Sequence, residues 1–282
     1  MHTALPLTLS GLPGSGFIRM NAGNNFLLTY SNAAGQNAIV VLPPFAEEMN
    51  KSRHLLSAVM RQLAALGYSC FMPDHYGTGD SEGDLDQASI GLWRADLLQL
   101  IQLLAQQGYQ SLSFIAVRFG TLQLFDLLNL HALPLPVKQL VLWQPLFDVD
   151  KFWQQFVRIK VAETMATGNK VSQKELEQQL QDGQQIEIAG YPLSPAFFAS
   201  LQTLQGAIPP LLAQTAVCWL ETSQLDNIAL PVQKMRDKLQ QCCQLSFMQL
   251  KAEPYWQTTE LANAEQLLAL TVKQFSGAAQ HD

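Results

Sequence analysis

Charged residues are scarce in this chain of 282 residues: they make up 14% of it, with 23 acidic and 17 basic side chains. Globular domains usually carry about a quarter charged residues, and a nucleic-acid-binding surface needs an excess of basic ones. The formal net charge of −6 therefore argues against a nucleic-acid partner. Hydrophobic residues make up 48% of the chain, which argues against disorder and is enough for a large core.

Cysteine is also scarce, and the spacing of Cys70, Cys218, Cys242 and Cys243 matches no metal-binding motif. We therefore expect no metal and no cofactor, and a reduced, cytoplasmic protein. No apolar run reaches the 18 or so residues of a membrane-spanning helix, so no membrane span is predicted. The first residues, MHTALPLTLSGLPGSG, lack the basic segment of a secretory signal.

Short β-branched or aromatic runs alternate with longer amphipathic stretches, which is typical of a parallel sheet covered by helices. Runs at 17–20 and 26–30 predict an opening hairpin. We then expect six buried strands, at 38–42, 68–72, 112–116, 137–143, 216–221 and 245–250. Helices are predicted between and after them, at 51–66, 89–107, 121–130, 231–241 and 259–275.

The alternation stops at Pro145, and residues 147–210 are punctuated differently. Ser172-Gln173-Lys174-Glu175 is a capping box, and Ser194-Pro195 is an N-cap followed by a first-turn proline. This pattern predicts a cap inserted at 147–210 into a single core domain made of 1–146 and 211–282. The hairpin, the six strands and the place of the insertion resemble the α/β-hydrolase fold. We expect a mostly parallel sheet of about eight strands with a helical cap.

The serine nucleophile of an α/β-hydrolase lies in a G-x-S-x-G motif at a tight turn between a strand and a helix. Gly79-Asp80-Ser81-Glu82-Gly83 matches this motif literally. The match lies in a polar loop well before the next predicted helix, so its context is wrong for a nucleophile. We predict that Ser81 is structural and that its hydroxyl holds the turn.

The required strand–turn–helix context falls instead at Ala116-Val117-Arg118-Phe119-Gly120. Its apex is Arg118, whose guanidinium stays protonated and serves neither as nucleophile nor as general base. No histidine follows the last predicted strand, where the sequence is Ala252-Glu253-Pro254-Tyr255-Trp256. We therefore predict that this chain lacks a Ser–His–Asp triad.

Other residues fit the remaining triad positions poorly. The segment that begins at Asp226 and ends at Pro231 loosely matches the place of the acid. His54 and His75 lie in or beside loops at the carboxyl ends of the strands, and we expect both to face solvent.

The segment PPFAEEMNKSRH, at 43–54, follows the first buried strand, where an α/β-hydrolase supplies a backbone N–H to its oxyanion hole. With the GDSEGD loop, the arginine at the elbow, LWQP at 142–145, FVR at 156–158, IEIAGYPLS at 186–194 and EPYWQTTE at 253–260, it resembles the exosortase A system-associated hydrolases of the second type. This similarity is spread over most of 38–275. It implies a hydrolase that accompanies exopolysaccharide and protein-sorting gene clusters of Gram-negative bacteria, with no defined substrate.

Arg118 is expected to face Glu47 and Glu48 across the pocket, beside backbone N–H groups of Phe119 and Ala46. Two arrangements stay open. In one, Arg118 binds an anionic ligand; in the other, Glu47 or Glu48 fills the position as an internal ion pair. We expect one of the two glutamates to face the pocket and the other to face solvent.

Further residues are candidates for lining the pocket: Gln144, Tyr255, Trp256, Trp143 and Phe152. These aromatic side chains either line an apolar site under the cap or belong to the core.

Arg158, on the expected cap helix, either reaches the mouth of the pocket or is solvated.

These residues leave two functions open, and both involve a small-molecule substrate or ligand in the pocket. The first is a hydrolase without a serine triad, in which Glu47 or Glu48 is the base and Arg118 stabilises an oxyanion. The alternative is a non-catalytic relative that binds an anionic ligand or a partner protein.

Overall fold

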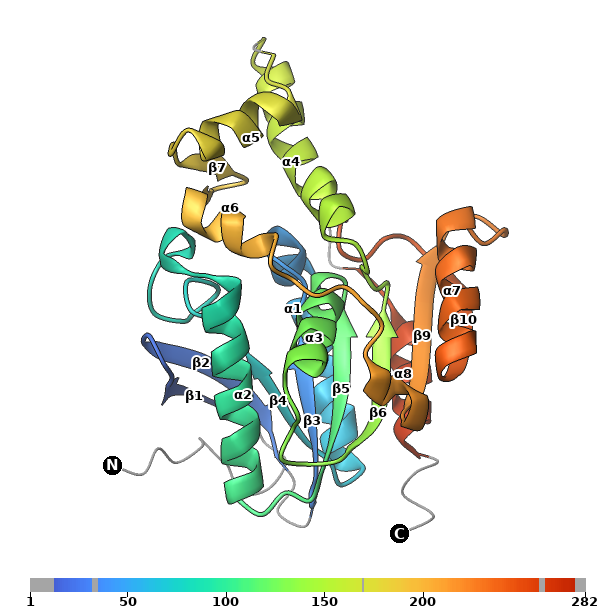
Figure 1. Cartoon of the computed structure of the whole chain (residues 1–282). Coiled ribbons are helices and arrows are strands. Elements are labelled where there is room, and N and C mark those ends of the chain that lie inside the picture. Colours follow the sequence, from blue (N-terminus) through green and yellow to red (C-terminus); the bar gives the residue numbers. More distant parts are fainter. Residues whose placement is uncertain (1–12, 32–34, 169, 259–261, 277–282) are drawn as a thin grey trace.

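The computed structural model of the chain describes residues 13–31, 35–168, 170–258 and 262–276. Its centre is an eight-stranded sheet in the order β1-β2-β4-β3-β5-β6-β9-β10 (Figure 1). Pairing is antiparallel at β1–β2 and β2–β4 and parallel elsewhere. The strands are β1 (Pro13–Arg19), β2 (Asn24–Tyr30), β3 (Asn37–Leu42), β4 (Ser69–Pro73), β5 (Ser111–Val117), β6 (Val137–Trp143), β9 (Ala216–Ser223) and β10 (Gln244–Lys251). The predicted α/β-hydrolase architecture is confirmed.

Helices cover both faces of this sheet. Alternate residues of β3 point to opposite sides, Ile39 and Val41 toward one helical layer and Val40 and Leu42 toward the other. The first layer holds α1 (Glu47–Ala65) and α8 (Glu265–Ser276), and the second holds α2 (Ile90–Gln106), α3 (Phe119–Leu130) and α7 (Leu230–Cys242). Continuous apolar runs in the central strands follow from this burial on both faces.

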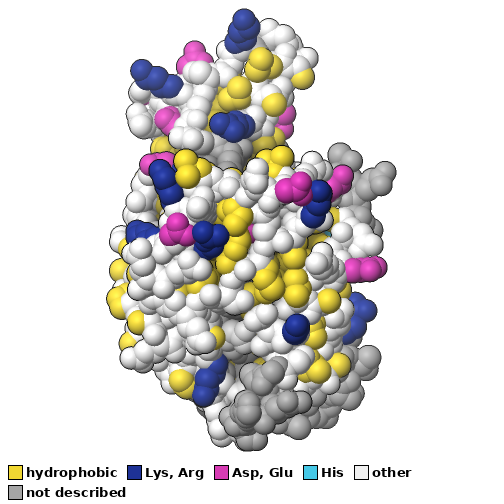
Figure 2. Space-filling view, turned by 90° about the vertical axis from the view of Figure 1, so that its right-hand side faces the viewer, with side chains coloured by type: hydrophobic (Ala, Val, Ile, Leu, Met, Phe, Trp, Pro, Cys, Tyr) yellow, Lys and Arg dark blue, Asp and Glu magenta, His cyan; other side chains and the backbone are white. Residues whose placement is uncertain are grey.

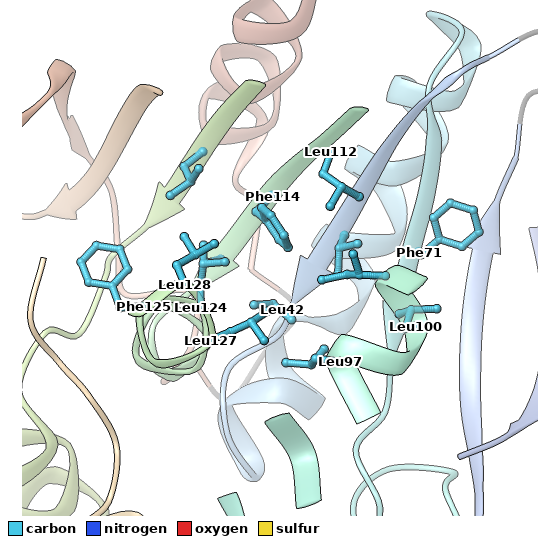
Figure 3. Close-up of a cluster of buried hydrophobic side chains, with 14 of the residues drawn as sticks. Leu42, Phe71, Leu97, Leu100, Leu112, Phe114, Leu124, Phe125, Leu127 and Leu128 are labelled. Carbon is cyan, nitrogen blue, oxygen red and sulfur yellow. The ribbon is translucent and has the colours of Figure 1, made fainter. Parts of the chain in front are cut away.

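The second layer packs through leucine and phenylalanine side chains. Leu97 and Leu100 of α2 and Leu124 of α3 lie against Leu42 and Phe114 of the sheet (Figure 3). This packing fixes the N-terminus of α3 at the carboxyl end of β5, where the elbow was predicted.

Residues 144–215 are called the β6–β9 segment. Most of it, up to α6, stands beyond the carboxyl ends of the central strands and forms a narrower upper part of the molecule, and the chain then runs back along the core to the start of β9 (Figures 1 and 2). The segment holds α4 (Val149–Ala166), α5 (Gln173–Gln181), β7 (Ile186–Ile188), β8 (Tyr191–Leu193), α6 (Pro195–Leu201) and the 3₁₀ helix η2 (Pro210–Gln214). The predicted capping box is present, with the Ser172 and Glu175 side chains bonded to each other's backbone N–H. None of the described helices has the length and apolar composition needed to cross a bilayer.

Two helix starts differ from the predicted ones by four residues or more. Helix α1 begins at Glu47, four residues before the predicted start at Lys51. The apolar stripe begins only at Met49, and two acidic residues in the first turn suit the positive end of the helix dipole. Helix α8 begins at Glu265, whereas the prediction started it at 259; residues 259–261 lie outside the described part.

Candidate functional site

The strand–turn–helix junction predicted at 116–120 is present. Strand β5 ends at Val117, α3 begins at Phe119, and Arg118 between them has φ 51° and ψ −113°. The turn is tight enough that a Cβ on Gly120 would lie 2.3 Å from the carbonyl oxygen of Leu42. The junction thus has the geometry of a nucleophile elbow, with an arginine at its apex.

The Arg118 side chain is held from three sides. Its Nε and Nη2 donate to both carboxylate oxygens of Glu48 at 2.9–3.2 Å. Nη2 also donates to Oε1 of Gln155 on α4 at 2.8 Å. The guanidinium carbon lies 4.6 Å from the centre of the Trp256 ring, within the range of a cation–π contact. Of the two arrangements left open by the sequence, the structure has the internal ion pair, and Glu48 is the partner.

This pair is buried unequally, because the Arg118 side chain is 6% exposed and that of Glu48 is 26% exposed. Water reaches the carboxylate and hardly reaches the guanidinium. A buried charge needs a partner to offset its lost hydration, so Glu48 is the group that keeps Arg118 in place.

Backbone strain is concentrated around this pair. Among the described residues, the non-glycine residues with positive φ are Ala46 (53°), Arg118 (51°), Gln144 (44°) and Ala189 (52°). Ala46 caps the N-terminus of α1, directly before Glu47, and Gln144 directly follows β6. Such conformations are costly for residues with a Cβ, and they cluster at functional sites.

A cavity of about 300 Å³ opens beside Arg118, between the core and the β6–β9 segment. Its size falls at the lower end of the range for small-molecule sites. The wall combines aromatic, aliphatic and charged side chains: Phe45, Glu47, Glu48, Lys51, Arg118, Phe152, Gln155, Phe156, Ile159, Ala189, Trp256 and Gln257.

Both glutamates of the 43–54 segment line this cavity, so the expectation that one of them faces solvent only is wrong. Glu47 accepts a hydrogen bond from the amide of Asn50, which also donates to the hydroxyl of Tyr191 on β8. Burial raises the pKa of Tyr191, and Glu47 adds to the effect. One helical turn further along α1, Lys51 lines the same wall.

A second carboxylate, Glu221, lies near Arg118 at the end of β9. Its oxygens accept hydrogen bonds from Gln144 Nε2 at 2.7 Å and Trp219 Nε1 at 2.8 Å. Burial raises the pKa of Glu221 to about 7, although both donors and the positive charge of Arg118 act in the opposite direction. The oxygen of the Gln144 side chain accepts from the backbone N–H of Thr222, which fixes the amide between the two strands.

The remaining predicted site residues lie at different depths. Ala46 and Phe119 line a separate cavity of about 10 Å³, which shares Phe45 with the first one. Tyr255 is buried behind Trp256, and burial raises its pKa well above the ordinary value.

Arg158 is exposed on α4 and is not among the residues that line the cavity, whereas its neighbours Phe156 and Ile159 are. Of the aromatic candidates, Phe152 and Trp256 line the cavity. Trp143 belongs to the core, where its indole N–H donates to Thr271.

Ser81 has the structural position that its context predicted. Its hydroxyl donates to the carbonyl of Asp74 at 2.7 Å and accepts from the backbone N–H of Phe26 at 2.8 Å. These bonds join the loop to β2 and β4.

His75 and His54, the latter within α1, are more buried than predicted. His75 is buried, stacks on Trp93 at 4.7 Å and bonds Gln123, and burial lowers its pKa to about 4. His54 is half-buried and lies 3.1 Å from the carbonyl of Ala262. Asp226 is exposed and pairs with Lys251.

Sequence reasoning missed Glu221 and seven of the residues that line the cavity: Phe45, Lys51, Gln155, Phe156, Ile159, Ala189 and Gln257. Phe45 and Lys51 belong to the 43–54 motif, so their closeness to the two glutamates was an available signal. Gln155 and Glu221 come from α4 and β9, and only the tertiary structure brings them to Arg118. Within the described ranges, no group of three or more His, Cys, Asp or Glu side chains is placed to hold a metal ion.

Comparison with known families gives one match over more than half of the chain. The sequence profile described as "Serine aminopeptidase, S33" matches residues 35–192, from the start of β3 to β8.

Similarity to curated proteins is confined to a short part of the chain. The mitochondrial palmitoyl-protein thioesterase ABHD10 of Homo sapiens is 32% identical over 79 residues, which are 28% of this chain and 25% of that protein. The Bos taurus protein is 31% identical over 80 residues, or 28% and 26% of the two chains. The chain thus spans about a quarter of the length of the curated relatives it matches.

Solved structures share the fold at low identity. Est1E from Butyrivibrio proteoclasticus with bound ferulic acid matches with a TM-score of 0.67 and 13% identity, over 95% of this chain and 100% of that one. Alpha/beta hydrolase domain-containing protein 10 from mouse matches with a TM-score of 0.57 and 13% identity, over 94% and 98%. At this identity the likeness concerns the fold alone.

Proposed function

The chain belongs to the serine aminopeptidase S33 family of α/β-hydrolases, and we propose that it binds a small molecule in its cavity without forming a serine acyl-enzyme. The observation that carries this proposal is the position of Arg118. An acyl-enzyme needs a hydroxyl or thiol at the apex of the elbow and a base beside it. Here the apex carries a guanidinium, tied to Glu48 by three hydrogen bonds.

The surroundings of Arg118 support the absence of a triad. In the chain order of an α/β-hydrolase the histidine comes last, and the residue that follows β10 and contacts Arg118 is Trp256. The neighbouring acid, Glu221, is bonded to Gln144 and Trp219. His75, although buried near the elbow, bonds Gln123.

We assign residues 147–210 the role of a cap that shapes access to the cavity. Phe152, Gln155 and Ile159 come from this part and line the cavity together with Glu48 and Lys51 of the core. A crevice beyond the carboxyl ends of the strands is the usual ligand site of an open α/β sheet.

The ligand we propose has an apolar part, because aromatic residues dominate the deeper wall. The likeness to a palmitoyl-protein thioesterase, and the fold shared with Est1E, whose structure holds ferulic acid, favour an acyl or aryl compound. The motifs at 43–54, 186–194 and 253–260 favour a role beside an exosortase and exopolysaccharide system. The free thiols of Cys70 and Cys218, both buried, favour a reducing compartment such as the cytoplasm.

A fluorophosphonate probe tests the central claim, since it labels activated serines. The full-length protein is incubated with the probe at pH 7.5 and analysed by mass spectrometry, beside an active serine esterase as positive control. We expect no labelled serine. Labelling of Ser81, or of any other serine, that heat denaturation abolishes would refute the proposal.

A second candidate function is hydrolysis without a serine, with a glutamate as base and Arg118 stabilising an oxyanion. One observation favours Glu47 for this role over Glu48: Arg118 binds both oxygens of Glu48, while within the described ranges Glu47 accepts only from Asn50. Turnover of p-nitrophenyl acetate should then fall about 100-fold in Glu47→Gln and stay unchanged in Glu253→Gln. Equal rates in the two variants would eliminate this candidate.

A further inference from the structure

We propose that the cavity takes an amphipathic monocarboxylic acid and that Lys51 receives its carboxylate. This inference rests on the proposed binding function and names the class of ligand. The sequence indicated Arg118 as the anion-binding group. The charges on the cavity wall indicate Lys51 instead, which lies one helical turn after Glu47 on α1.

The first step is to count the charges that are still unpaired. Four charged side chains line the cavity: Glu47, Glu48, Lys51 and Arg118. Arg118 and Glu48 neutralise each other. Lys51 is half-buried, and it forms no hydrogen bond or ion pair with the described part of the chain. A half-buried ammonium that faces a cavity without a partner favours a negatively charged ligand.

The second step is to compare Lys51 with Glu47, which would favour a cationic ligand instead. The Glu47 carboxylate already accepts from Asn50, and that amide is held in turn by Tyr191. Glu47 thus has a fixed neutral donor, whereas Lys51 has none. Of the two wall charges outside the Arg118–Glu48 pair, the ammonium is thus the one with no hydrogen bond to the described residues.

The third step concerns a second donor for the same carboxylate. Arg118 uses Nε and Nη2 in its bonds to Glu48 and Gln155, and its Nη1 donates to no described residue. An acid bound to Lys51 can therefore add a contact to the guanidinium without breaking the Arg118–Glu48 pair. Charge-assisted bonds of this kind are the stronger hydrogen bonds of proteins.

The fourth step is the apolar body of the ligand. Phe45, Phe152, Phe156 and Trp256 form the buried part of the wall, and Ile159 is exposed at its edge. At about 30 Å³ for each water-sized group, the cavity of about 300 Å³ holds roughly ten such groups. An aryl or short acyl acid such as 3-phenylpropanoate has this size.

Isothermal titration calorimetry of the full-length protein at pH 7.5 tests the inference with three probes of one shape: 3-phenylpropanoate, 3-phenylpropanamide and 3-phenylpropylamine. We expect the acid to bind at least tenfold more tightly than the amide, and the amine to bind most weakly. Lys51→Met should reduce the acid's advantage over the amide to less than twofold. Lys51→Arg, which keeps the charge, and Lys273→Met, a matched change on the exposed side of α8, should preserve it.

Three results would overturn the inference: equal binding of acid and amide, an acid preference that survives in Lys51→Met, or tighter binding of the amine. Failure of all three probes to bind would overturn it too. Thermal unfolding of each variant separates lost folding from lost binding. The proposed function is judged separately, because a labelled serine in the fluorophosphonate experiment would refute it whichever probe binds.

Discussion

Arg118 is an unusual residue for the apex of an elbow, because the turn directs the side chain into a nearly dry space. The chain compensates for its charge with Glu48, Gln155 and the face of Trp256. Removing one partner of a buried pair leaves the other uncompensated, whereas replacing both by apolar side chains is often neutral. The pair therefore holds α1 against the elbow. Its contribution to the free energy of unfolding can be measured only by changing both residues.

Arg118→Met should lower the free energy of unfolding by about 3 kcal/mol, because Glu48 is left without its cation. The double variant Arg118→Met/Glu48→Met should lose less than the single one. Urea unfolding at pH 7 of wild type, both single variants and the double variant measures this coupling. Strictly additive losses would mean that the pair is solvated and unimportant.

The carboxyl group of Glu221 makes the stability of the folded protein depend on pH. Its folded pKa of about 7 lies above the ordinary value of 4.5 because it is buried. The native state therefore keeps a proton that the unfolded chain has already released, and the stability contributed by Glu221 is lost as pH rises from 4.5 through 7. The full difference is about 3 kcal/mol.

Glu221→Gln removes this titration while keeping the shape. The stability of the variant relative to wild type should increase by about 2–3 kcal/mol between pH 5 and pH 8. Urea unfolding at the two pH values gives this difference, with Glu253→Gln on the exposed loop as control. An unchanged difference would show that Glu221 ionises freely in the folded protein.

At the scale of elements, the junction of β5 and α3 depends on a close approach to β3. A Cβ on Gly120 would lie 2.3 Å from the carbonyl oxygen of Leu42, while one on Gly91 in α2 would come no closer than 4.0 Å to its nearest neighbour, Ser89. Two glycines in helices thus differ only in what surrounds them.

Gly120→Ala should destabilise the protein by about 3 kcal/mol or more, because either α3 or β3 must shift. Gly91→Ala should be neutral or stabilise by up to about 1 kcal/mol through helix propensity. Thermal or urea unfolding compares the two. Similar effects of the two substitutions would contradict the packing described for the elbow.

The β6–β9 segment is tied to the core by polar contacts near the cavity. Gln155 on α4 accepts from Arg118, and Tyr191 on β8 accepts from Asn50. Gln155→Leu should therefore loosen α4, while Gln154→Leu, a matched change of an exposed neighbour, should not.

Hydrogen exchange followed by mass spectrometry measures how much α4 is loosened in Gln155→Leu. With about 1 kcal/mol for the lost bond, backbone amides of 149–166 should exchange about fivefold faster in Gln155→Leu. Equal exchange in the two variants would show that α4 is held by its apolar contacts alone.

At the scale of the whole molecule, two buried groups titrate in opposite senses. The folded pKa of His75 is lowered to about 4 by burial, so its contribution to stability is lost as pH falls from 6.5 to 4. Glu221 acts in the other direction over nearly the same range. Because these two contributions oppose each other, the free energy of unfolding of the wild-type protein should change little from pH 5 to pH 6.5.

His75→Phe keeps an aromatic ring against Trp93 and removes the titration of His75. The free energy of unfolding of this variant should then depend on pH through Glu221 alone. The free energy of unfolding of this variant should then fall by about 2 kcal/mol as pH rises from 5 to 6.5. A series of urea titrations across this range checks it. A flat profile in His75→Phe would mean that the two groups do not compensate each other.

Much of this fold is readable from the chain. The apolar run at 38–42 is buried on both faces, and the capping box at Ser172 forms as expected. These features are local, because the periods of strands and helices and the chemistry of caps are written in neighbouring residues. The elbow was found in the same way, from a strand, a small residue and a helix in succession.

For the candidate site, the sequence predicted some features and the tertiary structure was needed for the others. The chain by itself determined that Arg118 occupies the elbow and that the two glutamates follow the first buried strand, since both facts depend on adjacent residues. Only the tertiary structure decided that Glu48 is the partner, that Gln155 and Glu221 come near Arg118 from distant elements, and that Lys51 has no partner among the described residues. Pairing and burial depend on the packing of segments far apart in the chain, here Glu48 and Trp256, 208 residues apart, on one guanidinium. Such contacts leave no periodic trace in a single sequence.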